Sequence, residues 1–179
     1  LKEQTGGKAW YAWEDSLKFR NPDAIWQKRQ ELRDEIRFFC FVQYVFYTQW
    51  NALRAYAHEN DIRIIGDVPI YVPLDSADVW SNPELFQLDE NLAPTAVAGC
   101  PPDAFSEDGQ LWGNPLYRWD LLKQDNYSWW IRRLAAAGKI YDVVRMDHFR
   151  GFESYWSVPA GDTTAKNGQW VKGPDMDFM

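Results

Sequence analysis

The sequence predicts an α/β fold with parallel strands and long loops at the carboxyl ends of those strands, and three observations lead to this. Helical and strand-like segments alternate along the chain. The strand-like runs, near 62–67 and 141–146, are apolar without clean alternation, which is typical of strands buried on both faces. A long loop and a helical segment separate the two runs, so they form a βαβ unit and should pair in parallel.

The first helical region is expected over residues 22–59. Asn21 is a suitable N-cap, and Pro22 suits the first helical position. His58 falls near the solvent-facing end of this region and is interpreted as a surface residue without a role. Apolar residues recur in steps of three, four and seven, which marks one helix face: Ile25, Leu32, Ile36, Phe39, Val42, Phe46, Trp50, Leu53 and Ala57.

The first strand is rich in β-branched residues from Ile62 onward. Pro69 cannot donate a hydrogen bond to a sheet, so the regular strand should end near Gly66 or Asp67. This places the Asp67 carboxylate at the exit of the strand.

Residues 73–118 are expected to be mostly loop, with a short helix possible over Ser76–Trp80, because prolines interrupt the segment repeatedly. A loop of this length in a compact domain is usually functional or disordered, and its aromatic content argues against disorder. Helix should return over 119–137 with Gly138 as its stop. The segment 149–161 is expected to be irregular, and 162–179 a polar loop.

The second strand closes on Arg145-Met146-Asp147. Residues i and i+2 of a strand point to the same side, so Arg145 and Asp147 can lie side by side. A guanidinium beside a carboxylate keeps the acid ionised, which suits a nucleophile or a charge stabiliser and does not suit a proton donor. A structural ion pair is the alternative. Asp67, Asp147 and His148 should all meet at one sheet edge, where ligands bind in such folds.

Composition narrows the classes of function. The net charge of −7 and the scattered basic residues argue against a nucleic-acid surface. No apolar stretch is long enough to cross a membrane. Cys40 and Cys100 fit no metal or redox spacing, which indicates a reduced, cytoplasmic setting. With only His58 and His148 available, a zinc site is not expected, and Asp147-His148 lacks a third clustered ligand.

Aromatic residues are unusually frequent, with 11 Trp, 9 Tyr and 10 Phe. Core packing is the simplest explanation. Several of these residues lie in predicted loops, however, where flat rings can serve as platforms for sugar rings or as protein-binding hot spots.

Three segments carry a resemblance to a known family: IIGDVPIYVPLDSADVW, GCPPDAFSEDGQLWGNPLYRWD and VVRMDHFRGFESYWSVPAG. They are similar to the amylomaltases, the 4-α-glucanotransferases of glycoside hydrolase family 77. The resemblance covers essentially the whole chain. It implies that residues 1–179 are a single segment from the centre of a catalytic (β/α)8 TIM-type barrel, whose remainder is not in this chain.

The resemblance also implies roles for particular residues. Asp147 matches the nucleophile of the family, and Arg145 matches the arginine that orients it. The other matching positions are implied to contact substrate: Asp67, Phe105, Ser106, Gln110, Trp112, Asn114 and His148. Residues 101–115 match a flexible loop that covers bound glucan.

The implied activity is transfer of an α-1,4-glucan segment to the 4-hydroxyl of another glucan or glucose, with retention and without a metal or organic cofactor. The partners would be maltooligosaccharides, starch or glycogen. The general acid/base glutamate of the family lies downstream, and neither Glu107 nor Glu153 is in its motif. Two alternatives stay open: an α-glucan hydrolase or branching enzyme on a related barrel, and a non-catalytic glucan-binding module.

Overall fold

The computed structural model describes residues 1–178, which form two compact units. The first comprises Leu1–Gly66 and Ala135–Arg145, and the second comprises Asp67–Leu134 and the residues from Met146 onward. Within the described part of the chain, no helix is both long enough and apolar enough to span a bilayer.

The first unit is mainly helical: η1 (Trp10–Ala12), α1 (Asp15–Lys18), α2 (Pro22–Glu31) and α3 (Arg33–Glu59). The Asn21 side chain accepts hydrogen bonds from the N–H groups of Asp23 and Ala24, so the predicted N-cap is confirmed. The single helical region expected over 22–59 is wrong in one respect, because Leu32 separates α2 from α3. The apolar spacing hid this break, since Leu32 is itself one of the regularly spaced apolar residues and is buried.

Asp142 ties the carboxyl-terminal part of α3 to the chain before β4. Its carboxylate accepts hydrogen bonds from Arg54 Nε at 2.8 Å and from the Ile64 N–H at 2.9 Å, and it contacts His58 Nε2 at 2.8 Å. The Ile64 N–H, then His58 and Arg54, hold the pKa of Asp142 well below its usual range. The placement of His58 at the surface is confirmed, and the structure adds a contact with Asp142 that the sequence did not indicate. His58 is half-exposed, but it belongs to this clasp.

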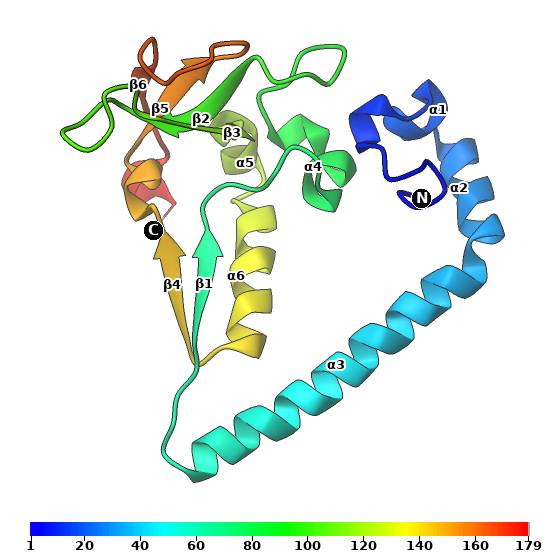
Figure 1. The fold of residues 1–179 in the computed structure, drawn as a ribbon. Coiled ribbons are helices and arrows are strands. Elements are labelled where there is room, and N and C mark those ends of the chain that lie inside the picture. The colour runs from blue at the N-terminus through cyan, green and yellow to red at the C-terminus, as the bar shows by residue number, and fades with distance from the viewer. Residues whose placement is uncertain (179) are drawn as a thin grey trace. The chain divides into compact units, whose positions relative to one another are not determined.

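β1 (Ile65–Pro69) and β4 (Val143–Asp147) are neighbours in a two-stranded sheet and run in the same direction (Figure 1). The predicted parallel pair is confirmed, although both strands begin later than expected. β1 continues to Pro69, which is tolerated because the last residue of a strand need not donate. The expectation of burial on both faces was wrong. Gly66 and Val68 are buried and their neighbours in β1 are exposed, so one face of the strand is covered and the other is open to solvent.

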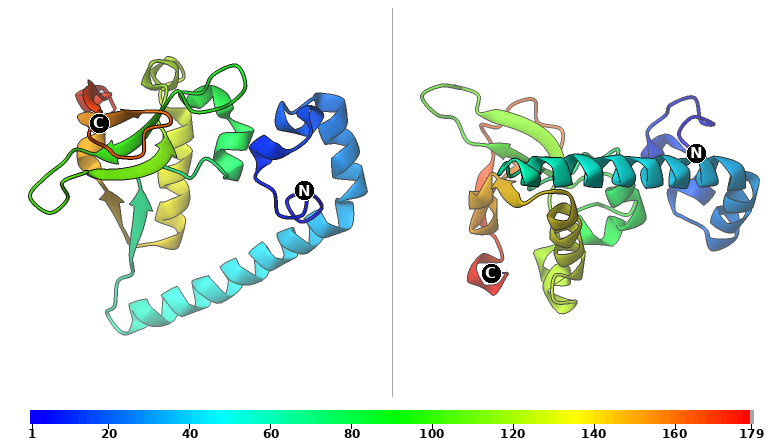
Figure 2. Two further views of the ribbon diagram at one scale, coloured as in Figure 1. Left: turned by 45° about the horizontal axis from the view of Figure 1, so that its top comes forward. Right: turned by 90° about the horizontal axis from the view of Figure 1, so that it is seen from below.

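The second unit contains a four-stranded antiparallel sheet in the order β3-β2-β5-β6. Figure 2 shows the fold from two further sides. The strands of this sheet are β2 (Ala96–Cys100), β3 (Gln110–Pro115), β5 (Ser154–Pro159) and β6 (Gln169–Lys172). The segments expected to be loop or irregular therefore hold strands. Alanine, glycine and proline in β2 and β3 give no β-strand signal, and partners distant in sequence supply the pairing.

Short helices complete the second unit. α4 (Ala77–Ser81) begins after Ser76, whose hydroxyl accepts from the Val79 N–H at 3.2 Å. The helix expected over 119–137 is two helices, α5 (Trp119–Gln124) and α6 (Ser128–Ile140). Asn126 and Tyr127 between them have positive φ, and Asp125 accepts from the N–H of Ser128. α6 runs through Gly138 instead of stopping there. Three 3₁₀ turns lie at Pro83–Leu85, Phe149–Phe152 and Asp175–Asp177.

Aromatic side chains fill the core of the second unit. Trp130, Tyr117, Phe86 and Phe152 are among its largest fully buried side chains. The rings of Phe86 and Tyr117 lie 5.2 Å apart, as do those of Trp130 and Phe152. Core packing thus explains Phe86 and Tyr117, two of the aromatics expected in loops. Other aromatic residues in the segments expected to be loops are exposed, so core packing does not explain them.

Candidate functional site

A small cleft of about 180 Å³ lies beyond the carboxyl ends of β1 and β4, within the second unit. Seven residues line it: Pro69, Ile70, Tyr71, Trp112, Asn114, Asp147 and His148. It is the position where ligands bind in parallel α/β sheets. Of the residues predicted from the sequence, the structure brings Trp112, Asn114, Asp147 and His148 together here.

Asp147 is the last residue of β4, and its side chain is exposed to the cleft. His148 follows in the left-handed conformation, with φ 52° and ψ 44°. This conformation is costly for a residue with a side chain and is often found at functional sites. It turns the chain from the strand into the Phe149–Phe152 turn, where the Gly151 N–H donates to the His148 carbonyl at 2.9 Å.

The His148 imidazole is prepared as a neutral hydrogen-bonding group. Burial lowers its pKa below the ordinary value, against the opposing effect of the Asp147 charge. Its Nε2 atom is buried and has no hydrogen-bond partner within residues 1–178. A buried polar atom without a partner is costly, so a ligand in the cleft could supply the missing bond.

Trp112 and Asn114 reach the cleft because β3 bulges. Val97 pairs with Pro115 and Gly99 with Leu111, so Trp112, Gly113 and Asn114 all lie opposite the single residue Ala98. Gly113 has φ +77°, a conformation that glycine adopts without strain. Bulges of this kind redirect side chains near binding sites. The Trp112 indole meets the His148 ring edge-on, with centroids 4.8 Å apart.

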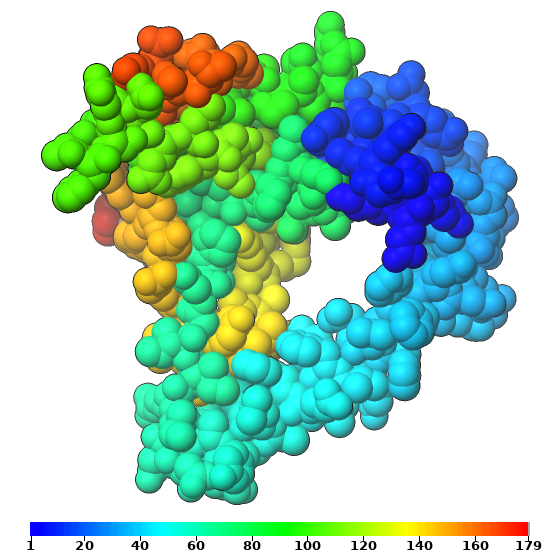
Figure 3. Space-filling view, viewed as in Figure 1, coloured from blue at the N-terminus to red at the C-terminus, as the bar shows by residue number. Residues whose placement is uncertain are grey.

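The loop between β2 and β3 projects away from the sheet (Figures 1 and 3). Asp103 Oδ1 accepts hydrogen bonds from the N–H groups of Phe105 and Ser106, both at 2.8 Å. Phe105 is 99% exposed, and neither it nor Ser106 lines the cleft. Gln110 joins the site indirectly, because its side-chain oxygen accepts from Trp112 Nε1 at 3.0 Å.

Asp67 and Arg145 lie in the strands themselves and do not line the cleft. Exposure alternates along β4, and Arg145 and Asp147 both fall among its exposed residues. That pattern agrees with the side-by-side placement expected from the sequence. The pairing of the two side chains stays a prediction.

Sequence reasoning missed Pro69, Ile70 and Tyr71 as lining residues. Their signal was their position, directly after the first strand on the edge where Asp67 and Asp147 were expected. Tyr71 is only 7% exposed, and burial raises the pKa of its hydroxyl. The Ile70 carbonyl accepts from the Tyr117 hydroxyl at 2.7 Å and from Arg133 Nη1 at 3.3 Å, which fixes the backbone beneath the cleft.

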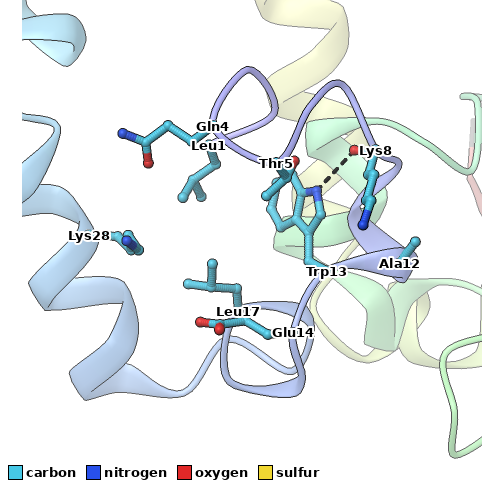
Figure 4. Close-up of a pocket in the computed structure, with 9 residues that line it drawn as sticks. All are labelled: Leu1, Gln4, Thr5, Lys8, Ala12, Trp13, Glu14, Leu17 and Lys28. Atoms are coloured by element: carbon cyan, nitrogen blue, oxygen red, sulfur yellow. Dashed lines mark hydrogen bonds between the residues drawn. The ribbon is translucent and has the colours of Figure 1, made fainter.

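A second hollow, of about 280 Å³, lies in the first unit (Figure 4). Trp13 Nε1 donates to the Lys8 carbonyl at 2.9 Å on one side of it. Two of the charged groups that line it are already engaged, because Lys28 pairs with Glu31 at 2.6 Å and Glu14 accepts from Ser16 Oγ at 2.8 Å. None of the residues predicted to act on a ligand lies there.

The cleft of the second unit offers a carboxylate, a neutral imidazole, an amide and an indole face. These groups can bind an uncharged ligand rich in hydroxyls, because they offer both hydrogen-bond donors and acceptors. Across residues 1–178, no three side chains of His, Cys, Asp or Glu gather in a way that could hold a metal ion. Fold and site together define an α/β protein with a carboxylate-bearing cleft at the ends of parallel strands.

Comparison with known proteins makes the assignment specific. The model of glycoside hydrolase family 77, described as 4-alpha-glucanotransferase, matches residues 1–179. The chain therefore belongs to this family, which confirms the resemblance seen in the sequence.

Individual relatives support the same family assignment. The chain is 51% identical over 180 residues to the 4-alpha-glucanotransferase of Clostridium butyricum, covering 100% of this chain and 37% of the relative. It is 52% identical over 174 residues to that of Thermus thermophilus, covering 97% and 35% respectively. Among solved structures, amylomaltase from Streptococcus agalactiae in complex with acarbose matches with a TM-score of 0.94 and 46% identity, over 99% of this chain and 36% of the other. The chain thus spans little more than a third of these relatives.

Proposed function

We propose that residues 1–179 form one central segment of a cytoplasmic 4-α-glucanotransferase, in which further strands complete a (β/α)8 barrel around β1 and β4. The parallel pair, the cleft at its carboxyl edge and the TM-score of 0.94 with an amylomaltase support this. The substrates are α-1,4-glucans, including maltooligosaccharides, starch and glycogen. Neither a nucleic acid nor a membrane is a partner.

In the proposed reaction, the Asp147 carboxylate attacks the anomeric carbon of a bound glucan. The bond to the departing glucan oxygen breaks, and that oxygen takes a proton from a general acid supplied by the rest of the enzyme, about 5–5.5 Å from the nucleophile. A covalent glucosyl ester results. The 4-hydroxyl of an acceptor glucan then attacks the ester and returns its proton to the same acid/base group. Two inversions give net retention, and side chains alone suffice.

The remaining site residues serve this step by holding and orienting the sugar. Arg145 orients Asp147 toward the anomeric carbon. Asp67 and His148 bind hydroxyls of the sugar at the reacting centre. Phe105, Ser106, Gln110, Trp112 and Asn114 bind the glucan from the β2–β3 hairpin and its loop. When the loop closes, it excludes water, so that an acceptor glucan resolves the ester in preference to water.

The observation that carries the proposal is the Asp147 carboxylate at the end of β4, lining one cleft with the Trp112 indole and the His148 imidazole. Asp147→Asn keeps the shape of the side chain and removes its charge. In the full-length enzyme acting on maltotriose, this variant should lower formation of glucose and longer maltooligosaccharides by about 10³-fold or more, as expected when a covalent nucleophile is lost.

The matched control is Asp120→Asn, because Asp120 is an exposed carboxylate paired with Arg118 and lies outside the cleft. It should leave the rate near that of the unmodified enzyme. Near-normal transfer by Asp147→Asn would reject the nucleophile assignment. If the unmodified enzyme formed products shorter than maltotriose and none that are longer, it would instead be a hydrolase.

A further inference from the structure

We infer that Tyr71 is a positioning residue, whose ring holds the Trp112 indole in place against the cleft and thereby favours transfer over hydrolysis. The inference rests on the proposed function, since it concerns how the same cleft handles a glucan.

Tyr71 joins the aromatic core to the wall of the cleft. On one side its ring stacks on Tyr117, with centroids 6.0 Å apart and planes 19° apart. On the other side it packs against Trp112 at 6.1 Å, with planes 53° apart. Trp112 in turn meets His148. A continuous row of rings therefore runs from a fully buried core residue to the histidine beside Asp147.

The core end of this row is rigid. Tyr117 is 1% exposed and is surrounded by the rings of Phe86, Trp129 and Trp130. Its hydroxyl donates to the Ile70 carbonyl, immediately before Tyr71. Both the ring and the backbone of Tyr71 are thus tied to the same anchor.

The cleft end needs that support. Within residues 1–178, β3 is an edge strand that pairs with β2 alone, and Trp112 lies inside its bulge opposite Ala98. Its neighbour Gly113 has φ +77° and leaves open space where a side chain would be. Regular ladder hydrogen bonds therefore restrain this part of β3 weakly. The ring contacts with Tyr71 and His148 compensate.

The packing around Tyr71 leaves it little freedom to move. A Cβ atom at Gly151 would lie 2.7 Å from Ile70 Cδ1, 3.2 Å from His148 Cδ2 and 3.6 Å from the Tyr71 hydroxyl oxygen. The absence of a side chain at Gly151 is what lets Ile70, Tyr71 and His148 share this space. Because the Tyr71 ring is packed this closely, it fixes Trp112 relative to the core.

The test compares Tyr71→Phe, which keeps the ring, with Tyr71→Ala, which removes it, in the full-length enzyme acting on maltotriose. Loss of an aromatic pair of this kind corresponds to a change of about two- to tenfold. Tyr71→Ala should raise the ratio of hydrolysis to transfer by about that factor, and Tyr71→Phe should restore the ratio. Tyr127→Ala is the matched control, because Tyr127 is equally buried, at 8% against 7% exposed, and packs on Phe178 away from the cleft.

A double-mutant cycle separates positioning from general loss of stability. If Tyr71 acts through Trp112, then Tyr71→Ala should add no further change in the ratio to a Trp112→Ala enzyme. Additive effects, or an equal change in Tyr127→Ala, would overturn the inference. Should Tyr71→Ala fail to fold, Tyr71→Leu in the same cycle gives the answer. An active Asp147→Asn enzyme would overturn the proposed function itself, which is a different result.

Discussion

Removing the Tyr117 hydroxyl should destabilise the floor of the cleft by a predictable amount. In Tyr117→Phe the ring stays in the core, and the 2.7 Å hydrogen bond from the hydroxyl to the Ile70 carbonyl is lost. A neutral hydrogen bond contributes about 0.5–1.5 kcal/mol net. Arg133 Nη1 remains 3.3 Å from the same carbonyl, so the oxygen keeps one donor. The expected loss in free energy of unfolding is therefore about 1 kcal/mol.

A second substitution makes the reasoning stricter. Arg133→Met in the Tyr117→Phe background removes both donors and leaves a buried carbonyl unsatisfied, which costs about 1–3 kcal/mol. The double variant should consequently lose more than the sum of the two single variants. This excess is the coupling expected when two donors share one acceptor.

Urea unfolding of the full-length enzyme, followed by tryptophan fluorescence and analysed at constant slope, measures these differences. Tyr155→Phe is the control. Its hydroxyl accepts a 3.2 Å bond from Gln87 Nε2, which also donates to the Tyr117 carbonyl at 3.0 Å and so keeps a partner. That variant should lose less than about 0.5 kcal/mol. Equal losses in Tyr117→Phe and Tyr155→Phe, or strict additivity in the double variant, would refute the argument.

Three further predictions concern other parts of the chain. Gly109→Ala should lower stability by about 1–3 kcal/mol, because φ is +68° and the new Cβ would lie 2.4 Å from the Cys100 carbonyl oxygen; calorimetry should show a clearly smaller loss for Gly161→Ala, where φ is +94° and no atom lies within 4 Å. The pKa of Asp142 is lowered below its ordinary value of 3.8, so its contribution to stability should be complete above that pH and be lost as the pH falls below it. Acid titration of Asp142→Asn should show a weaker pH dependence in this range, and an unchanged curve would contradict the clasp. The pKa of His148 is lowered below 6.5, so the contribution of its neutral ring to the stability of the fold is present above pH 6.5 and declines as the pH falls through and below that value. An NMR titration of its ring protons measures this pKa, and a midpoint above 6.5 would show that burial is not the dominant cause.

The sequence allowed the parallel pair and the edge that carries the site to be predicted, because both depend on local signals. β-branched runs and a proline marked the strands, and the ends of those strands placed Asp147 and His148. The four-stranded antiparallel sheet could not be predicted, since Gly99 pairs with Trp156, which lies 57 positions further along the chain, and the short strands carry no pattern of their own.

The cleft itself illustrates the same limit. Trp112 and Asn114 were chosen through family resemblance, yet the reason they reach Asp147 is a bulge that no spacing rule shows. Tyr71 was missed because a buried tyrosine after a strand looks like ordinary core. Two helix breaks were also hidden. The break at Leu32 was hidden because the apolar periodicity continues across it. The break at Asp125–Tyr127 is produced by positive φ angles and by capping from an aspartate, which the apolar spacing does not show.

The way the β2–β3 loop is fastened bears on how enzymes with this architecture can diverge. The Asp108 carbonyl accepts from the buried Ala165 N–H at 3.0 Å, and Lys166 pairs with the Asp108 carboxylate at 2.6 Å. Trp156 Nε1 donates to the Ala165 carbonyl, which secures the other side of this joint. Residues 101–107 lie beyond this joint. Insertions, deletions or exchanged tips in that stretch can therefore be sampled by evolution, or grafted in the laboratory, while the indole and the nucleophile keep their places.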